Sequence, residues 1–205
     1  MSLKKLIKPL LFTRGMKSIT RLTLDRELDK QFSRLKPGLV LDIGSKLSPY
    51  RSKIASTKYL RLDIDPDSNP DICSDIHNIN WESDYFDTVI LTETLEHLYD
   101  PGKAMREIYR VMKPGGVCIA STRFVYPYHP DPHDYFRFTW DSLQFVFGQF
   151  SVVEVHTHGN KLQTLWQLIN VGRLRLILNV FNPILDLFSS KTTTCPLGFV
   201  VHATK

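Results

Sequence analysis

The chain has 205 residues, of which 42% are hydrophobic and 23% are charged, and its formal net charge is +5. This composition excludes a disordered chain and a collagen-like repeat. The length predicts one domain that buries about 70% of the surface exposed by its unfolded form. The charge is modest, so only local clusters of basic residues would indicate a nucleic acid or a membrane as a partner.

The first 21 residues form such a cluster. Six lysine and arginine residues stand among leucine, isoleucine and phenylalanine, a composition typical of a helix that lies on an anionic membrane surface. Lys8 and Pro9 interrupt the apolar stretch and no small-residue cleavage site follows, so we do not expect a signal peptide. Peripheral membrane contact through this segment is therefore one hypothesis, and an ordinary solvated arm is the other.

The three cysteines have neither zinc-site nor disulfide spacing, and this favours a reduced, cytoplasmic protein. We expect an N-terminal basic arm and helix at residues 1–35, followed by the main domain at residues 36–205. Residues 161–190 are apolar but too often interrupted by polar residues for a membrane span. They predict a helical insertion that covers the substrate cleft or a dimer interface, with membrane contact as the alternative.

Helices and strands alternate along the chain. A helical apolar pattern covers residues 18–35. Further helices are expected after the capping signals Ser48-Pro49, Asp100-Pro101 and Thr139, with Pro114-Gly115-Gly116 ending the second of them. Apolar runs predict strands at residues 39–43, 58–63, 71–74, 86–91, 116–122, 151–157 and 197–204. Because most of these runs are continuous, we predict a doubly wound α/β fold with helices on both faces of a mostly parallel sheet.

Four motifs follow one another in this framework. They are Val40-Leu41-Asp42-Ile43-Gly44-Ser45, Tyr59-Leu60-Arg61-Leu62-Asp63, Phe86-Asp87-Thr88-Val89-Ile90-Leu91, and Arg110-Val111-Met112-Lys113-Pro114-Gly115-Gly116. In this order they resemble the class I S-adenosylmethionine-dependent methyltransferases. The segment Leu95-Glu96-His97-Leu98 is most similar to the small-molecule, type 11-like members. The resemblance covers about residues 36–158 and implies a Rossmann-like seven-stranded sheet with an antiparallel last strand.

The resemblance also implies where S-adenosylmethionine would bind. Gly44 allows a close backbone approach, and Asp63 can accept hydrogen bonds from both ribose hydroxyls. Asp75 and Ile76 offer an acidic group beside an apolar wall for the adenine. The expected cofactor contacts are Asp42, Gly44, Ser45, Asp63, Asp75, Ile76 and Thr92.

The glycine pattern of that site is incomplete. Lys46 and Ser48 stand where the family's second and third glycines would fall. Lys46 can hold a carboxylate as a point charge, and Ser48 can cap a helix. This departure also counts against a nicotinamide dehydrogenase, whose pyrophosphate needs small residues at these positions.

Residues 124–139 are the most unusual segment, because three prolines stiffen a loop rich in histidine, aspartate and tyrosine. We interpret it as a substrate lid. Candidate catalytic residues are His97, His133 and Arg137. Candidate substrate contacts are Tyr126, His129, Asp134 and Tyr135. An ion pair between Asp134 and Arg137 within an ordered loop is the alternative, and a metal bound by His129, His133 and Asp134 is not expected.

We therefore expect a methyltransferase that uses S-adenosylmethionine to methylate oxygen on a small or lipid-linked acceptor. A degenerate methyltransferase fold that serves as a cofactor-binding or partner protein remains the first alternative. A nucleic-acid methyltransferase is the second, and no nucleic acid is expected as a partner because no Asn-Pro-Pro-Tyr-like segment follows the fourth strand.

Overall fold

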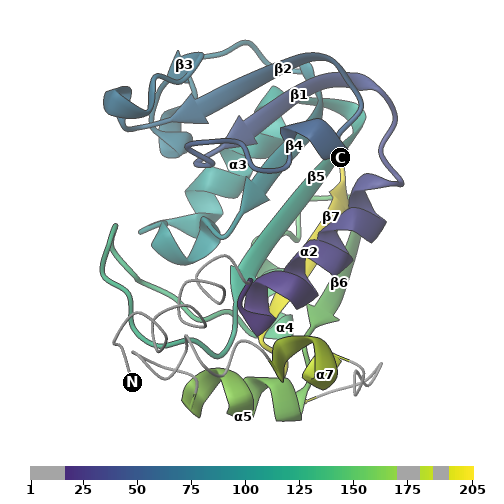
Figure 1. Cartoon of the computed structure of the whole chain (residues 1–205). Coiled ribbons are helices and arrows are strands. Elements are labelled where there is room, and N and C mark those ends of the chain that lie inside the picture. Colours follow the sequence, from purple (N-terminus) through teal and green to yellow (C-terminus); the bar gives the residue numbers. More distant parts are fainter. Residues whose placement is uncertain (1–16, 170–180, 187–193) are drawn as a thin grey trace, which may run out of the picture.

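The protein is built on a seven-stranded sheet (Figure 1). The computed structural model describes residues 17–169, 181–186 and 194–205. The strands are β1 (Gly38–Ile43), β2 (Ser56–Asp63), β3 (Ile72–Cys73), β4 (Phe86–Thr92), β5 (Met112–Arg123), β6 (Val152–His158) and β7 (Gly198–Thr204). Their order is β3-β2-β1-β4-β5-β7-β6, and β7 runs antiparallel to both of its neighbours. The predicted fold class is confirmed.

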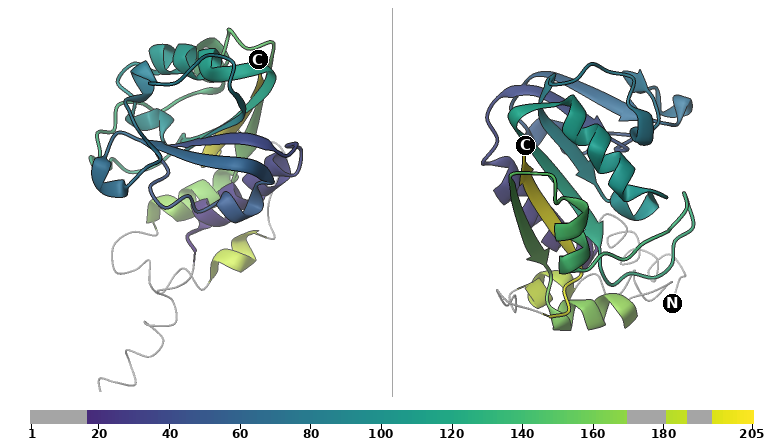
Figure 2. Two further views of the ribbon diagram at one scale, coloured as in Figure 1. Left: turned by 90° about the horizontal axis from the view of Figure 1, so that it is seen from above. Right: turned by 180° about the vertical axis from the view of Figure 1, so that it is seen from behind.

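Helices cover both faces of the sheet because the side chains of the central strands alternate between the faces. Val40, Ile90 and Ile119 pack in one cluster with α2 (Ile19–Phe32). The adjacent residues Leu41 and Val89 pack in the other cluster, with α3 (Pro101–Val111) and α4 (Trp140–Val146). Figure 2 shows α3 and α4 on the face opposite α2.

The helices α2, α3 and α4 all begin with a side-chain capping bond, and the caps at Asp100 and Thr139 were predicted from the sequence. The Ser18 hydroxyl accepts a hydrogen bond from the backbone N–H of Arg21 at the start of α2. The Asp100 carboxylate accepts from the backbone N–H of Lys103 at the start of α3, and Thr139 forms a capping box at the start of α4. Each bond satisfies a backbone donor that the helix itself leaves free.

The prediction of a helix after Ser48-Pro49 is wrong. Only a 3-10 turn, η1 (Arg51–Lys53), forms there. Ser48 has a φ of 47°, whereas a helix N-cap needs extended backbone. Since β2 begins at Ser56, too few residues remain for a stable α-helix. The face of the sheet above β1 and β4 is therefore covered by α2.

The end of α3 also differs from the prediction. The helix ends at Val111, and Pro114-Gly115-Gly116 lies within the extended segment that begins β5. A proline disfavours helical backbone in the residue before it, so the helix has to end before Lys113.

Two helices, α5 (Lys161–Ile169) and α7 (Asn182–Asp186), form the described part of the predicted insertion before β7. They lie against the start of α2, where Thr20 donates a hydrogen bond of 3.0 Å to Gln167 and Asn182 donates one of 3.0 Å to the backbone oxygen of Lys17. No helix among the described residues has the length and hydropathy of a membrane span. The predicted membrane-binding segment covers residues 1–21, and its residues 1–16 lie outside the described part of the chain.

Candidate active site

The carboxyl ends of β1, β2 and β4 bring the predicted cofactor contacts to one edge of the sheet. The three strands are parallel neighbours, so Gly44, Asp63 and Thr92 follow or end them at the same side. Gly44 has a φ of +68°, and a Cβ added there would lie 2.9 Å from the side chain of Thr94. A side chain at this position would be strained and would collide with Thr94.

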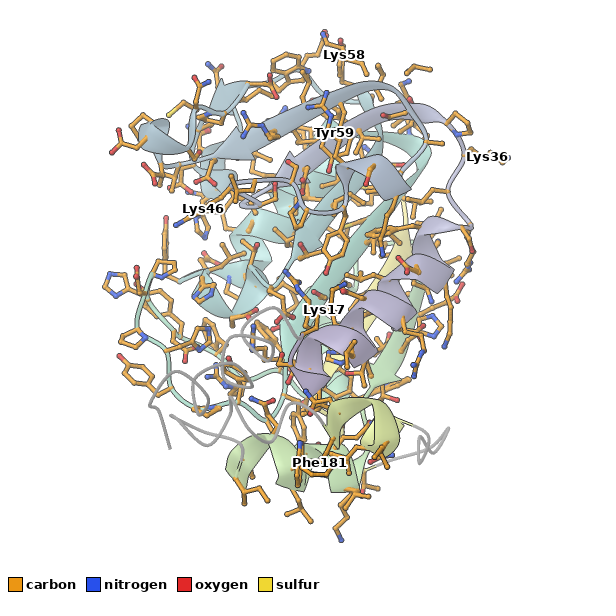
Figure 3. All side chains as sticks on the ribbon, viewed as in Figure 1. Lys17, Lys36, Lys46, Lys58, Tyr59 and Phe181 are labelled. Carbon is orange, nitrogen blue, oxygen red and sulfur yellow. The ribbon has the colours of Figure 1, made fainter. Side chains whose placement is uncertain are left out.

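The loop after Gly44 keeps a glycine-like backbone without the glycines. Lys46 and Ser48 have φ values of 49° and 47°, in the left-handed region that residues with a Cβ rarely adopt. The Ser48 hydroxyl lies 3.0 Å from that of Ser45, which closes the loop on itself. Lys46 is exposed at the open edge of the molecule (Figure 3). Lys46 and Ser48, at the positions of the family's glycines, therefore keep a glycine-like loop shape but strain the backbone.

Asp42 lies beneath this loop. Its side chain is 2% exposed, and the hydroxyl of Tyr59 donates a hydrogen bond of 2.7 Å to its Oδ2. Burial raises the pKa of Asp42, and the hydroxyls of Ser45 and Tyr59 oppose that rise. Asp42 thus supports the loop from the protein side.

Asp63 and Asp75 occupy the next turns of the same edge. Asp63 is 7% exposed and its Oδ1 accepts a hydrogen bond of 3.0 Å from the backbone N–H of Asp65. Asp75 caps the 3-10 turn η3 (Ile76–Asn78) and accepts bonds from both the backbone and the ring of His77. Partial burial acts to raise the pKa of Asp75, but these bonds from His77 outweigh it and lower the pKa. Ile76 is buried beside it.

A cavity of about 400 Å³ opens beside the glycine loop. Gly44, Ser45, Thr92 and Tyr126 line it, together with the first residues of α2. Asp63, Asp75 and Ile76 do not line this cavity. A larger cavity of about 970 Å³ lies beside β6 and the start of α4, and none of the residues predicted from the sequence to form the site lines it.

A charge cluster lies at the smaller cavity, which Glu93, Arg123 and Tyr126 line. Nε of Arg123 lies 2.7 Å from Glu93 and 3.6 Å from Glu96, and its guanidinium carbon lies 3.7 Å from the centre of the Tyr126 ring. Glu96 is completely buried, and Thr122 donates a hydrogen bond of 2.9 Å to its Oε2. Burial and the neighbouring Glu93 raise the pKa of Glu96 to about 8. Glu96 and Arg123 were not predicted as site residues, although Glu96 directly precedes His97 in the motif after β4.

The predicted lid packs back on that motif. Backbone N–H groups of Tyr135 and Phe136 donate to the backbone oxygen of Glu96, the first at 2.8 Å. His97 Nδ1 lies 2.6 Å from the backbone oxygen of His133. The imidazole of His133 is itself exposed and faces the ring of Tyr135.

Asp134 and Arg137 form the ion pair that was the alternative interpretation of this loop. Both guanidinium nitrogens of Arg137 bind the Asp134 carboxylate, with Nη2 to Oδ2 at 2.6 Å. This pairing lowers the pKa of Asp134 to about 2. Oδ2 also accepts from the backbone N–H of His129 at 3.1 Å. The pair holds the shape of the lid, while His97 and His129 face each other with ring centres 5.0 Å apart.

Residues 41–120 match the family model of the methyltransferase domain. No curated protein matches the sequence. A methyltransferase from Archaeoglobus fulgidus that depends on S-adenosylmethionine has the same fold, with 17% identity, 95% of this chain and 98% of that chain covered, and a TM-score of 0.59. A possible histamine N-methyltransferase from Thermotoga maritima is 16% identical, with 91% of each chain covered and a TM-score of 0.60. The [4+2]-cyclase SpnF is 15% identical, with 91% of this chain and 80% of that chain covered and a TM-score of 0.57.

Proposed function

We propose that the chain is a class I S-adenosylmethionine-dependent methyltransferase that methylates oxygen on a small or lipid-linked acceptor. Its fold and the match of residues 41–120 to the methyltransferase domain support this proposal. One observation supports the acceptor chemistry above all. Glu93 lines the cavity beside Gly44, and Glu96 and His97 follow it in the turn after β4, so carboxylate and imidazole groups that can take up a hydroxyl proton lie next to the strand ends.

The residues at the strand ends fit S-adenosylmethionine. Gly44 is exposed, lines the cavity and carries no Cβ, so the backbone can approach the methionine portion of the cofactor. Asp63 uses one carboxylate oxygen for the Asp65 N–H and offers the other to the ribose hydroxyls. Buried Ile76 provides an apolar surface next to the carboxylate of Asp75.

The cofactor supplies a methyl group on a positive sulfur, and the acceptor oxygen forms the new C–O bond as the C–S bond breaks and sulfur keeps its electron pair. The protein has to align the oxygen and take up its proton. His97 Nδ1 donates to the backbone oxygen of His133, which leaves the lone pair of Nε2 for that proton. The Asp134–Arg137 pair keeps the lid in place above it.

Binding of the cofactor is tested with Asp63→Ala in calorimetric titrations with S-adenosylmethionine and S-adenosylhomocysteine. Loss of the acceptor for a ribose hydroxyl removes about 1 to 3 kcal/mol, or roughly five- to a hundredfold in affinity. Asp67→Ala is the matched control, because Asp67 is an exposed carboxylate four residues further along the chain. Equal affinities of the two variants would contradict the assignment of Asp63.

The acceptor claim needs a transfer assay. Cofactor with a labelled methyl group is incubated with the enzyme and with separated lipid and aqueous fractions of a cell extract, and the labelled bond is identified in the product. A product methylated on nitrogen or carbon would refute the proposed oxygen transfer.

The degenerate-fold alternative rests on two observations: the unusual loop with Lys46 and Ser48, and the likeness to a cyclase, which shows that this fold also occurs in a protein described as a cyclase. Absence of cofactor binding by the wild type at millimolar concentration would favour that alternative over the methyltransferase.

A further inference from the structure

Side chains from two separate segments meet beside the proposed acceptor site. Glu96 and His97 lie in the 3-10 turn η4 (Leu95–His97) after β4, and His129 lies in the lid. One carboxylate or imidazole atom of each lies within 4.8 Å of the other two. We propose that Glu96, His97 and His129 bind a divalent transition-metal ion that coordinates the acceptor hydroxyl. This role for the ion rests on the proposed methyl transfer.

Both imidazoles are oriented as metal ligands usually are. A histidine that binds a metal generally donates its other ring N–H to a carbonyl or carboxylate, which fixes the tautomer. Nδ1 of His97 lies 2.6 Å from the backbone oxygen of His133. Nδ1 of His129 lies 3.2 Å from Oδ2 of Asp134 and 3.3 Å from the backbone oxygen of Pro127. In both rings Nδ1 therefore carries the proton and Nε2 keeps a lone pair for a cation.

The carboxylate of Glu96 supplies the third ligand. Its Oε2 accepts from Thr122, whereas its Oε1 is buried and accepts no hydrogen bond from any described residue. The nearest cation is Nε of Arg123, at 3.6 Å. A buried oxygen without a donor carries a substantial desolvation cost, and a metal ion would remove it.

The surrounding charges are nearly balanced, so a cation meets no net repulsion. Three carboxylates and two guanidinium groups surround the imidazoles: Glu93, Glu96 and Asp134, and Arg123 and Arg137. Because the pKa of Glu96 is raised to about 8, Glu96 keeps its proton near neutral pH and the other four charges cancel. A divalent ion displaces that proton, leaves one net positive charge at the site, and suits an acceptor oxygen that becomes an anion.

The donor set indicates the class of metal. Two imidazoles and one carboxylate suit zinc, iron, manganese and cobalt, whereas magnesium and calcium prefer oxygen ligands. Ligand atoms at about 2.1 Å from a tetrahedral zinc lie roughly 3.4 Å apart. Side-chain rotations that move these atoms by about 1 Å would therefore bring them to the separation that a bound zinc requires. Three protein ligands leave a position for the acceptor.

A bound ion changes the roles of these residues. The acceptor hydroxyl binds the metal, its pKa falls, and its proton passes to solvent before the oxygen takes the methyl group. His97 then acts as a ligand and not as the proton acceptor. Methyl transfer would require the metal, and a chelator would remove activity without removing the cofactor.

The test uses the full chain after chelator treatment. Calorimetric titration with Zn²⁺, Mn²⁺ and Mg²⁺ is combined with the absorption spectrum of added Co²⁺, which reports coordinated imidazole. His129→Ala and Glu96→Gln each remove a ligand. His133→Ala is the matched control, because it changes a histidine of the same loop and keeps the backbone oxygen that orients His97. Thermal unfolding checks that each variant is folded.

We expect zinc, manganese and cobalt to bind more tightly than magnesium. His129→Ala and Glu96→Gln should weaken binding by at least about a hundredfold, since the loss of an outer-shell partner alone costs about 10- to 100-fold. His133→Ala should bind like the wild type. Absence of binding by the wild type, or equal losses in His129→Ala and His133→Ala, would overturn the proposal. Titration of the same metal-free sample with S-adenosylhomocysteine tests the proposed function separately.

Discussion

Lys46 offers a direct measurement of the strain in the cofactor loop. Its φ of 49° places a residue with a Cβ in left-handed backbone, which costs about 1 to 2 kcal/mol. Lys46→Gly removes this cost but gives the unfolded chain more freedom, which costs about 0.5 to 1 kcal/mol. The backbone oxygen of Lys46 that accepts from Arg61 is retained. We therefore expect Lys46→Gly to stabilise the protein by about 0.5 to 1 kcal/mol.

The assay is equilibrium unfolding in urea, with the midpoint and the slope fitted separately. Lys36→Gly is the control, because Lys36 is an exposed lysine whose φ is not positive, on the side of the molecule away from Lys46 (Figure 3). Lys36→Gly should lose about 0.5 to 1 kcal/mol, since only the entropy term remains. If both variants were destabilised equally, the argument that the loop is strained would be refuted.

Two further predictions concern buried polar groups. Tyr59→Phe removes the hydroxyl that donates to buried Asp42 and should lower the free energy of unfolding in urea by about 1 to 3 kcal/mol. Tyr128→Phe is the control and should change little, because Tyr128 is 74% exposed. Equal effects of the two variants would contradict the role of the Tyr59–Asp42 bond. Burial, with Arg123 adding to it, lowers the pKa of His158 to about 3, so the unfolded chain takes up a proton near pH 6.5 that the native state refuses. The stability that depends on neutral His158 is complete above about pH 6.5 and falls toward pH 3 by up to about 1.4 kcal/mol per pH unit. In urea unfolding measured across this pH range, His158→Gln should make the free energy of unfolding fall less steeply. If wild type and variant lost stability in parallel, this role of His158 would be refuted.

The sheet could be predicted because its information is local. Continuous apolar runs such as Val40–Ile43 and Phe86–Leu91 mark buried strands whatever their partners are. The helix after Ser48 could not be excluded in the same way. Its capping signal is genuine, but a left-handed φ at Ser48 and the early start of β2 become visible only when the loop is folded.

The candidate site was predictable where one segment carries it. Gly44 and Asp63 each end a strand, and both lie at the expected edge of the sheet. The Glu93, Glu96 and Arg123 cluster depends instead on the parallel pairing of β4 with β5, which sets Thr92 opposite Ser121. The proposed metal ligands come from two segments, and sequence spacing does not predict that these segments meet. His133 was expected to act through its imidazole, but it binds His97 through its backbone oxygen.

The contacts between α2 and the insertion limit how the protein can be redesigned. Lys17 and Thr20 line the cavity beside the glycine loop and also bind Asn182 and Gln167 of the insertion. A graft that replaced residues 161–186 to change acceptor choice would therefore also disturb the wall of that cavity. Specificity engineering in this scaffold has to begin in the lid, or has to exchange α2 and the insertion together as one cassette.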